Sequence, residues 1–115
     1  MNLTLTADTF SVELEPMERF WAFHLGARID IPRAHIQSVS STMPPLSWRV
    51  LRAPGTGLPW LVAGTFYTEQ GREFWYITQR DRVLTLDLTS QDYYKRLILT
   101  VEDPSAWIAR LQPLL

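Results

Sequence analysis

The chain has 115 residues, 46% of them hydrophobic and 12% aromatic, with a formal net charge of −1 at pH 7 and no cysteine. This length and composition predict one domain with a packed core, spanning residues 1–115. The charge argues against a nucleic-acid partner, because no net positive field attracts phosphates. The lack of cysteine excludes disulfides, thiol catalysis and thiolate metal sites.

The start of the chain carries no targeting signal of the usual kind. Its first ten residues, MNLTLTADTF, lack the charged and then apolar layout of a signal peptide. No run of about 18 apolar residues follows, so we expect no integral membrane segment. These features predict a soluble, cytoplasmic protein.

The first part of the chain predicts two strands and a short helix. Apolar and polar residues alternate at Leu3 and Leu5 and again from Phe10 to Leu14, and a period of two is typical of strands. From Pro16 the apolar spacing becomes helical. Because proline is favoured at the first helical position, we predict one short inserted helix near residues 16–25.

The next segment predicts strands that are less regular. Ile29 and Ile31 alternate with charged residues and indicate a strand. Ile36 and Val39 are three positions apart, so a strand there must bulge or shift. Residues 42–59 contain several prolines and glycines, and we interpret them as a long irregular connection.

The stretch LRAPGTGLPW, residues 51–60, raises the question of a phosphate-binding loop. A Walker-type loop needs a glycine followed directly by Lys and Ser or Thr, and a dinucleotide-binding loop needs a third glycine that opens a helix. Neither pattern is present. We therefore interpret the stretch as a structural loop.

The second half of the chain reads as four strands and a helix. The strands are expected at about residues 61–68, 73–78, 83–88 and 96–101. Asp103 followed by Pro104 is a strong helix start, because aspartate caps the free N–H groups and proline fits the first position. We predict a helix from Pro104 to about residue 112.

Turns at residues 70–71 and 80–81 would pair these strands in sequence order. Phe66 would then lie opposite Trp75, and Trp75 opposite Leu86. We expect the resulting core face to hold Val62, Phe66, Trp75, Ile77, Leu84, Leu86 and Leu88.

The other face of the same strands would place Tyr67, Phe74 and Tyr76 toward solvent. A contiguous aromatic patch often marks a contact surface, so these three residues are candidate protein-contact residues. The alternative is that a loop or the N-terminal segment covers them, or that they form ordinary cross-strand pairs. Both interpretations remain open at this point.

A second candidate site is an anion-binding rim. The segment between Ile31 and Thr68 contains three arginines and no acidic residue. Arg49 and Arg52 flank the Pro- and Gly-containing stretch, and an arginine can bind a phosphate or carboxylate with two parallel hydrogen bonds. The alternative is that these arginines pair with acidic residues brought near by folding.

No catalytic or metal-binding set is evident. His24 and His35 are the two histidines, and two histidines without cysteine or a nearby carboxylate trio make a poor metal site. No nucleophile-elbow pattern is present. We expect no metal, no cofactor and no enzymatic activity.

The segments "LRAPGTGLP", "GREFWYIT" and "YYKRLILTVEDP", with the final helix "VEDPSAWIARL", resemble those of small bacterial pleckstrin-homology-like (PH-like) proteins of unassigned activity. The resemblance implies a mainly β split barrel of two packed antiparallel sheets, capped by the C-terminal helix. Phosphoinositide-binding members use a basic loop between their first two strands. In this chain the corresponding loop, residues 7–9, is short and acidic, so phosphoinositide binding by that mode is not expected.

Two functions follow from these observations. The first is a non-enzymatic binding or scaffolding module that acts through protein–protein or self-association contacts, for example as a homodimer. The alternative is a domain that binds a small anion or a lipid head group through an arginine-bearing loop.

Overall fold

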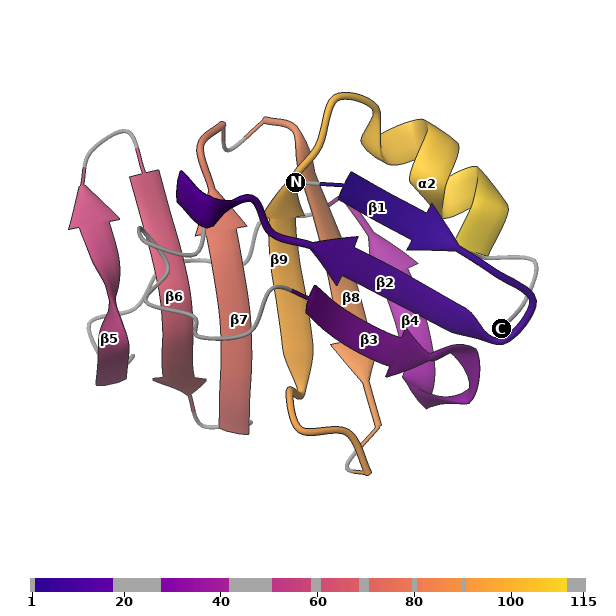
Figure 1. Cartoon of the computed structure of the whole chain (residues 1–115), viewed down its shortest axis with the longest axis horizontal. Helices are drawn as coiled ribbons and strands as arrows, with labels where there is room; N and C mark the ends of the chain where they lie inside the picture. Colours follow the sequence, from indigo (N-terminus) through magenta and orange to yellow (C-terminus); the bar gives the residue numbers. More distant parts are fainter. Residues whose placement is uncertain are drawn as a thin grey trace.

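The computed structural model describes residues 2–17, 28–41, 51–58, 61–68, 71–79, 81–89 and 91–111, with the backbone alone described at residues 51–58, 61–62 and 68. These residues form a mainly β structure with two sheets and a C-terminal helix (Figure 1). The described strands do not close into a barrel.

The smaller sheet is an antiparallel meander of three strands. Its strands are β1 (Asn2–Leu5), β2 (Thr9–Glu13) and β3 (Arg28–Pro32), in that order. The two strands predicted from the alternating pattern are confirmed, and a short turn joins them into an antiparallel hairpin. Arg33 follows β3 and donates from Nη1 to the backbone oxygens of Thr6 and Ala7. This arginine therefore ties β3 to the first turn.

The larger sheet has six strands in the order β4-β8-β9-β7-β6-β5. A 3₁₀ turn, η1 (Arg33–His35), leads into it. The strands are β4 (Ile36–Ser40), β5 (Leu51–Leu58), β6 (Leu61–Thr68), β7 (Gly71–Ile77), β8 (Val83–Leu88) and β9 (Arg96–Thr100). The β7–β9 pair is parallel and the other pairs are antiparallel. The mixed sheet differs from the two antiparallel sheets that the sequence resemblance implies.

The three-stranded sheet lies across one face of the six-stranded sheet, and β5 and β6 lie to one side of it in the view of Figure 1. Fully buried residues from both sheets meet between them, including Phe10, Ile31, Leu86 and Leu97. The main core therefore lies between the sheets.

Helix α2 (Pro104–Leu111) closes one end of this core. Asp103 caps it as predicted, because its Oδ1 accepts a 3.2 Å hydrogen bond from the N–H of Ala106. Leu111 is buried, and Trp107 packs edge-on against Phe10 with ring centroids 5.8 Å apart. The helix thus covers the end of the core with its apolar face.

The prediction of a loop at residues 51–60 is wrong for Leu51–Leu58. These residues form β5, which is an edge strand of the six-stranded sheet. The register shifts between Arg52 and Gly55, where Pro54 lies. An edge strand tolerates proline because one side of it makes no ladder hydrogen bonds, and a bulge accommodates the residue that cannot pair. Turn-forming residues therefore do not exclude a strand at a sheet edge. A register shift also interrupts β4, between Ile36 and Ser38, as the spacing of its apolar residues predicts.

The expected strand pairing is wrong in two respects. In the β6–β7 hairpin, Phe66 pairs with Glu73 and Gly64 with Trp75, two residues away from the predicted register. Because the shift is even, each side chain keeps its face. Strand β8 does not pair with β7, because β9 lies between them.

The insertion of β9 reverses the expected core face of β7, whereas the leucines of β8 face the main core as predicted. Trp75 pairs with Ile98, and Ile98 pairs with Thr85, so Trp75 shares a face with Thr85 and not with Leu86. The leucines of β8 lie in the main core together with Phe74 and Tyr76. Trp75 belongs to a second buried cluster on the opposite face, which contains Phe66, Trp75, Ile77, Val83 and Ile98.

Two sequence predictions fall largely outside the described residues. Of the inserted helix at residues 16–25, the structure describes Pro16 and Met17, which are helical. The side chain of Val62, expected in the core, also lies outside the described part of the chain.

Candidate functional site

A row of four polar side chains crosses the six-stranded sheet on the face opposite the main core. Ser38, Asp87, Arg96 and Glu73 occupy successive register positions on β4, β8, β9 and β7. We call these four residues the polar row. Because each is the direct cross-strand neighbour of the next, the strand register brings four separate parts of the sequence together.

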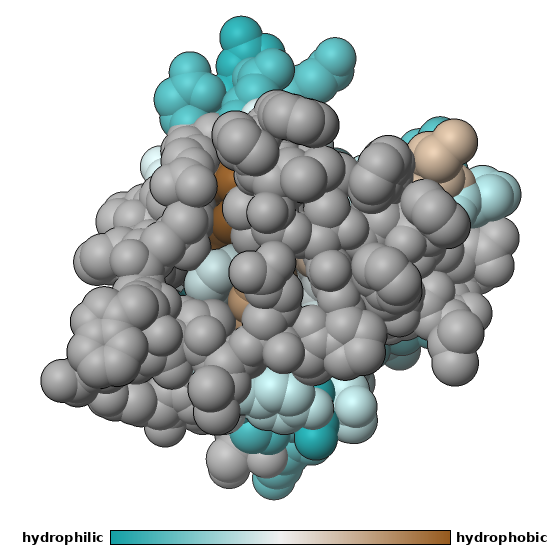
Figure 2. Space-filling view, turned by 90° about the vertical axis from the view of Figure 1, so that its left-hand side faces the viewer, coloured by the Kyte–Doolittle hydropathy of each residue, from teal (hydrophilic) through white to brown (hydrophobic). Residues whose placement is uncertain are grey.

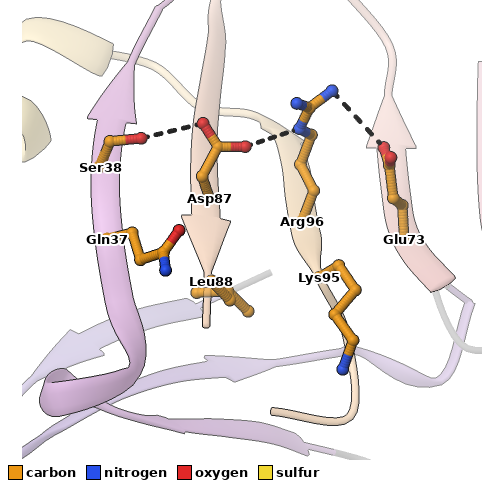
Figure 3. A pocket seen from close by; sticks show the side chains of 7 residues that line it. All are labelled: Gln37, Ser38, Glu73, Asp87, Leu88, Lys95 and Arg96. Carbon is orange, nitrogen blue, oxygen red and sulfur yellow. Dashed lines mark hydrogen bonds and ion pairs between the residues drawn. The ribbon is translucent and has the colours of Figure 1, made fainter. Parts of the chain in front are cut away.

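Hydrogen bonds and ion pairs connect the polar row (Figure 3). Ser38 donates from Oγ to Asp87 Oδ2 at 2.9 Å, and Arg96 donates from Nε to Asp87 Oδ1 at 2.7 Å. On its other side, Nη1 of Arg96 lies 4.0 Å from Glu73 Oε1. Arg96 therefore lies between two carboxylates.

Glu73 also connects the polar row to the second apolar cluster. Its side chain is 1% exposed, and its Oε1 accepts a 3.0 Å hydrogen bond from Trp75 Nε1. The Trp75 indole stacks on Phe66, with centroids 4.3 Å apart. The cross-strand partner of Trp75 is Gly64, which has a φ of 134°. Because glycine has no side chain, the indole can stack on its diagonal neighbour Phe66.

A pocket of about 450 Å³ opens over the polar row. Its lining residues are Gln37, Ser38, Glu73, Asp87, Leu88, Lys95 and Arg96. The lining contains two acidic and two basic side chains, so its formal charges balance. The pocket is therefore chemically suited to a polar ligand without a net charge, and its volume falls in the range of ligand-binding clefts.

A cationic and aromatic surface lies at the end of β6 and β7. Arg72 is the register partner of Tyr67, and its guanidinium carbon lies 5.9 Å from the Tyr67 ring centroid and 3.7 Å from that of Tyr93. Arg72 also donates from Nη1 to the backbone oxygen of Tyr93 at 3.1 Å. We call Tyr67, Arg72 and Tyr93 the Tyr–Arg cluster.

The Tyr–Arg cluster packs against buried aromatic residues. Tyr94 packs edge-on against Tyr93 at 4.9 Å and lies 5.7 Å from Phe74. Burial raises the pKa of the Tyr94 phenol above its ordinary value of 10.0, although a contact with Thr65 acts in the opposite direction. The exposed ring of Tyr93 thus packs on a buried neighbour.

The loop that carries Tyr93 is held by Asp92, which is buried. Asp92 Oδ2 lies 2.9 Å from His35 Nδ1, and its Oδ1 accepts a hydrogen bond from the backbone N–H of Tyr94. Lys95 donates from Nζ to the backbone oxygen of the same aspartate. His35 therefore has a structural contact, and His24 lies outside the described residues.

The predicted aromatic contact surface requires correction. Phe74 is 0% exposed and Tyr76 is 9% exposed, because their face of β7 packs into the main core. Tyr67 is 41% exposed and belongs to the Tyr–Arg cluster. The prediction of three solvent-facing aromatics is thus wrong for two of them.

The predicted arginine rim can be placed only in part. Arg49 and the side chain of Arg52 lie outside the described residues. The backbone of Arg52 pairs with Phe66, which pairs with Glu73. The backbone of Arg52 on β5 is therefore at the same register position as the polar row, two strands beyond Glu73.

Sequence reasoning missed the polar row and most of the Tyr–Arg cluster. Glu73, Asp87 and Arg96 come from three segments that become neighbours only because β9 lies between β7 and β8. A signal was available in the sequence, because each of the three predicted strands carries one of these charged residues among apolar neighbours. A charged residue at such a position indicates a polar site on an otherwise apolar sheet face. The adjacent tyrosines at residues 93 and 94 were a similar signal for the second surface.

Figure 2 looks toward the β5 side of the molecule. The described residues that reach the surface there are mainly hydrophilic, and most of the described hydrophobic atoms visible lie in a recess. No helix within the described ranges has the length and apolar character needed to cross a bilayer. Among the same residues, no group of three histidine, cysteine or acidic side chains could hold a metal ion.

No protein-family model, curated protein or solved structure matches this chain. Its function must therefore be inferred from the two surfaces described above.

Proposed function

We propose that this chain is a non-enzymatic binding module that contacts a protein partner through the Tyr–Arg cluster. One observation carries the proposal. Three large hydrophobic side chains are exposed in the described part of the chain, and two of them, Tyr67 at 41% and Tyr93 at 63%, have their rings within 6 Å of the Arg72 guanidinium carbon.

The chemistry of the cluster suits protein recognition. Tyrosine and arginine are enriched among the residues that dominate binding energy at protein interfaces. Tyrosine loses little conformational entropy on binding, and here Tyr93 is already held by Arg72 and Tyr94. A surface that is ordered before binding retains more of its contact energy as affinity.

The partner is another protein or a second copy of this chain, and one set of measurements separates the two. Light scattering of the purified chain over a range of concentrations detects self-association. A photo-crosslinking amino acid at position 93 captures a different partner in cells, and the same amino acid at the exposed Met17 serves as the control. A monomer that gives no more crosslinked product at position 93 than at position 17 would exclude the proposal.

Variants test whether the tyrosines carry the contact. Tyr67→Ser combined with Tyr93→Ser should reduce association at least about tenfold, since one such residue contributes 2 kcal/mol or more. The matched control is Tyr94→Phe, which changes the buried neighbour and leaves the exposed rings in place. Equal association of all three proteins would contradict the proposal.

The PH-like family and the bacterial origin implied by the resemblance remain predictions. The C-terminal helix that follows the last strand supports the family assignment. Binding of a small anion by Arg49 and Arg52 also remains a prediction.

A further inference from the structure

We propose that the pocket over the polar row binds a small zwitterion of the α-amino acid type. This site is separate from the Tyr–Arg cluster, and the proposal goes beyond protein contact.

The pocket wall presents opposite charges in direct contact. Asp87 and Arg96 are joined at 2.7 Å, and their side chains are 38% and 23% exposed. A ligand with an ammonium and a carboxylate on neighbouring atoms can align antiparallel to this pair, so that each ligand charge faces its opposite. A ligand with one charge would meet an attractive and a repulsive group at once, because the formal charges of the lining balance.

Both wall residues have capacity for further hydrogen bonds. A carboxylate offers about four acceptor sites, and among the residues that the structure describes, the contacts of Asp87 with Ser38 and Arg96 occupy two of them. A guanidinium has five N–H donors, of which Arg96 directs one to Asp87 and one toward Glu73. The exposed amide of Gln37, which also lines the pocket, can both donate and accept.

The second sheet contains the same three residue types in a similar arrangement. Ser11 and Arg28 both donate to Asp30 Oδ1, at 2.7 and 2.8 Å, and the Asp30 side chain is 47% exposed. These residues are not among those that line the pocket over the polar row. Asp30 is therefore the matched control for Asp87.

The test follows the indole N–H signal of Trp75 by ¹H–¹⁵N NMR during titration with glycine. This N–H donates to Glu73, which lines the pocket, while the Trp107 indole on α2 serves as the internal control. We expect a saturable shift of the Trp75 signal with a dissociation constant of about 1 mM. Acetate, ethylammonium and acetamide, each lacking one or both charges, should bind at least about tenfold more weakly.

Two variants complete the test. Asp87→Asn keeps the shape of the wall and an acceptor oxygen for Arg96, and its NH2 group can donate to the Ser38 hydroxyl in place of the present hydrogen bond. Gln37→Ala changes an exposed side chain, so the spectra of both variants should remain those of the folded protein. Both should weaken glycine binding, Asp87→Asn by about tenfold or more, whereas Asp30→Asn should bind like the parent chain. No saturable shift, equal binding of a singly charged or neutral analogue, or equal weakening by Asp30→Asn would each overturn the proposal.

Discussion

Trp75 donates a 3.0 Å hydrogen bond to Glu73, two residues earlier on the same strand, and Glu73 is 1% exposed. The pair joins the apolar cluster around Trp75 to the polar row. The fold accommodates this buried carboxyl group because the Trp75 indole N–H donates to it and the Arg96 guanidinium lies 4.0 Å away.

Replacing Glu73 with leucine should destabilise the fold. The substitution leaves the buried Trp75 N–H without its acceptor and removes one carboxylate from Arg96, so we expect a loss of about 2–4 kcal/mol. Glu73→Gln keeps an acceptor oxygen and should cost about half as much. Urea denaturation measures both values, and a loss below about 0.5 kcal/mol for the leucine variant would contradict this role.

Gly71 begins β7 with a φ of 122°, and an added Cβ would lie 2.9 Å from Cγ of Lys95. Gly71→Ala should therefore cost about 2 kcal/mol of unfolding free energy, from backbone strain together with the steric contact. In a Lys95→Ala background the steric part disappears, so the penalty should fall by about 0.5–1 kcal/mol. An unchanged penalty would show that the backbone conformation alone is responsible.

Asp30 should contribute to stability in a pH-dependent way. The hydrogen bond from Ser11, opposed by burial and aided by Arg28, holds the pKa of Asp30 below its ordinary value of 3.8. Because the folded pKa is lowered, the contribution is present above about pH 4 and is lost as the pH falls through the folded pKa. Ser11→Ala should raise the Asp30 pKa in a carboxyl NMR titration. Thr4→Ala, at the cross-strand partner of Ser11, is the control and should leave the pKa unchanged.

Tyr94 should make the fold sensitive to alkaline pH. Burial raises the pKa of its phenol, so the folded state keeps the proton that the unfolded chain loses above about pH 10. Its contribution is complete below that pH and is lost as the pH rises through the folded pKa. Tyr94→Phe should lose less stability between pH 8 and pH 11 than the parent chain, as measured by urea midpoints. Equal losses for the parent chain and the Tyr94→Phe variant would contradict the prediction.

Sequence pattern by itself determined the local elements of this protein. Alternation located the first hairpin and most later strands, and Asp103 with Pro104 located the start of α2, because backbone geometry and capping depend on adjacent residues. It also determined which residues of a strand share a face. Even the two-residue error in the β6–β7 register left those faces unchanged.

Only the tertiary structure decided which face became the core and which polar residues met. Both faces of β7 carry large apolar side chains, so alternation separates Trp75 from Tyr76 without indicating which of them the second sheet covers. That choice depends on β9 pairing between β7 and β8, a contact between segments distant in sequence. The same pairing joins Glu73, Arg96 and Asp87 into one row. Long-range pairing is decided by the free energy of the whole assembly, which no local residue pattern encodes.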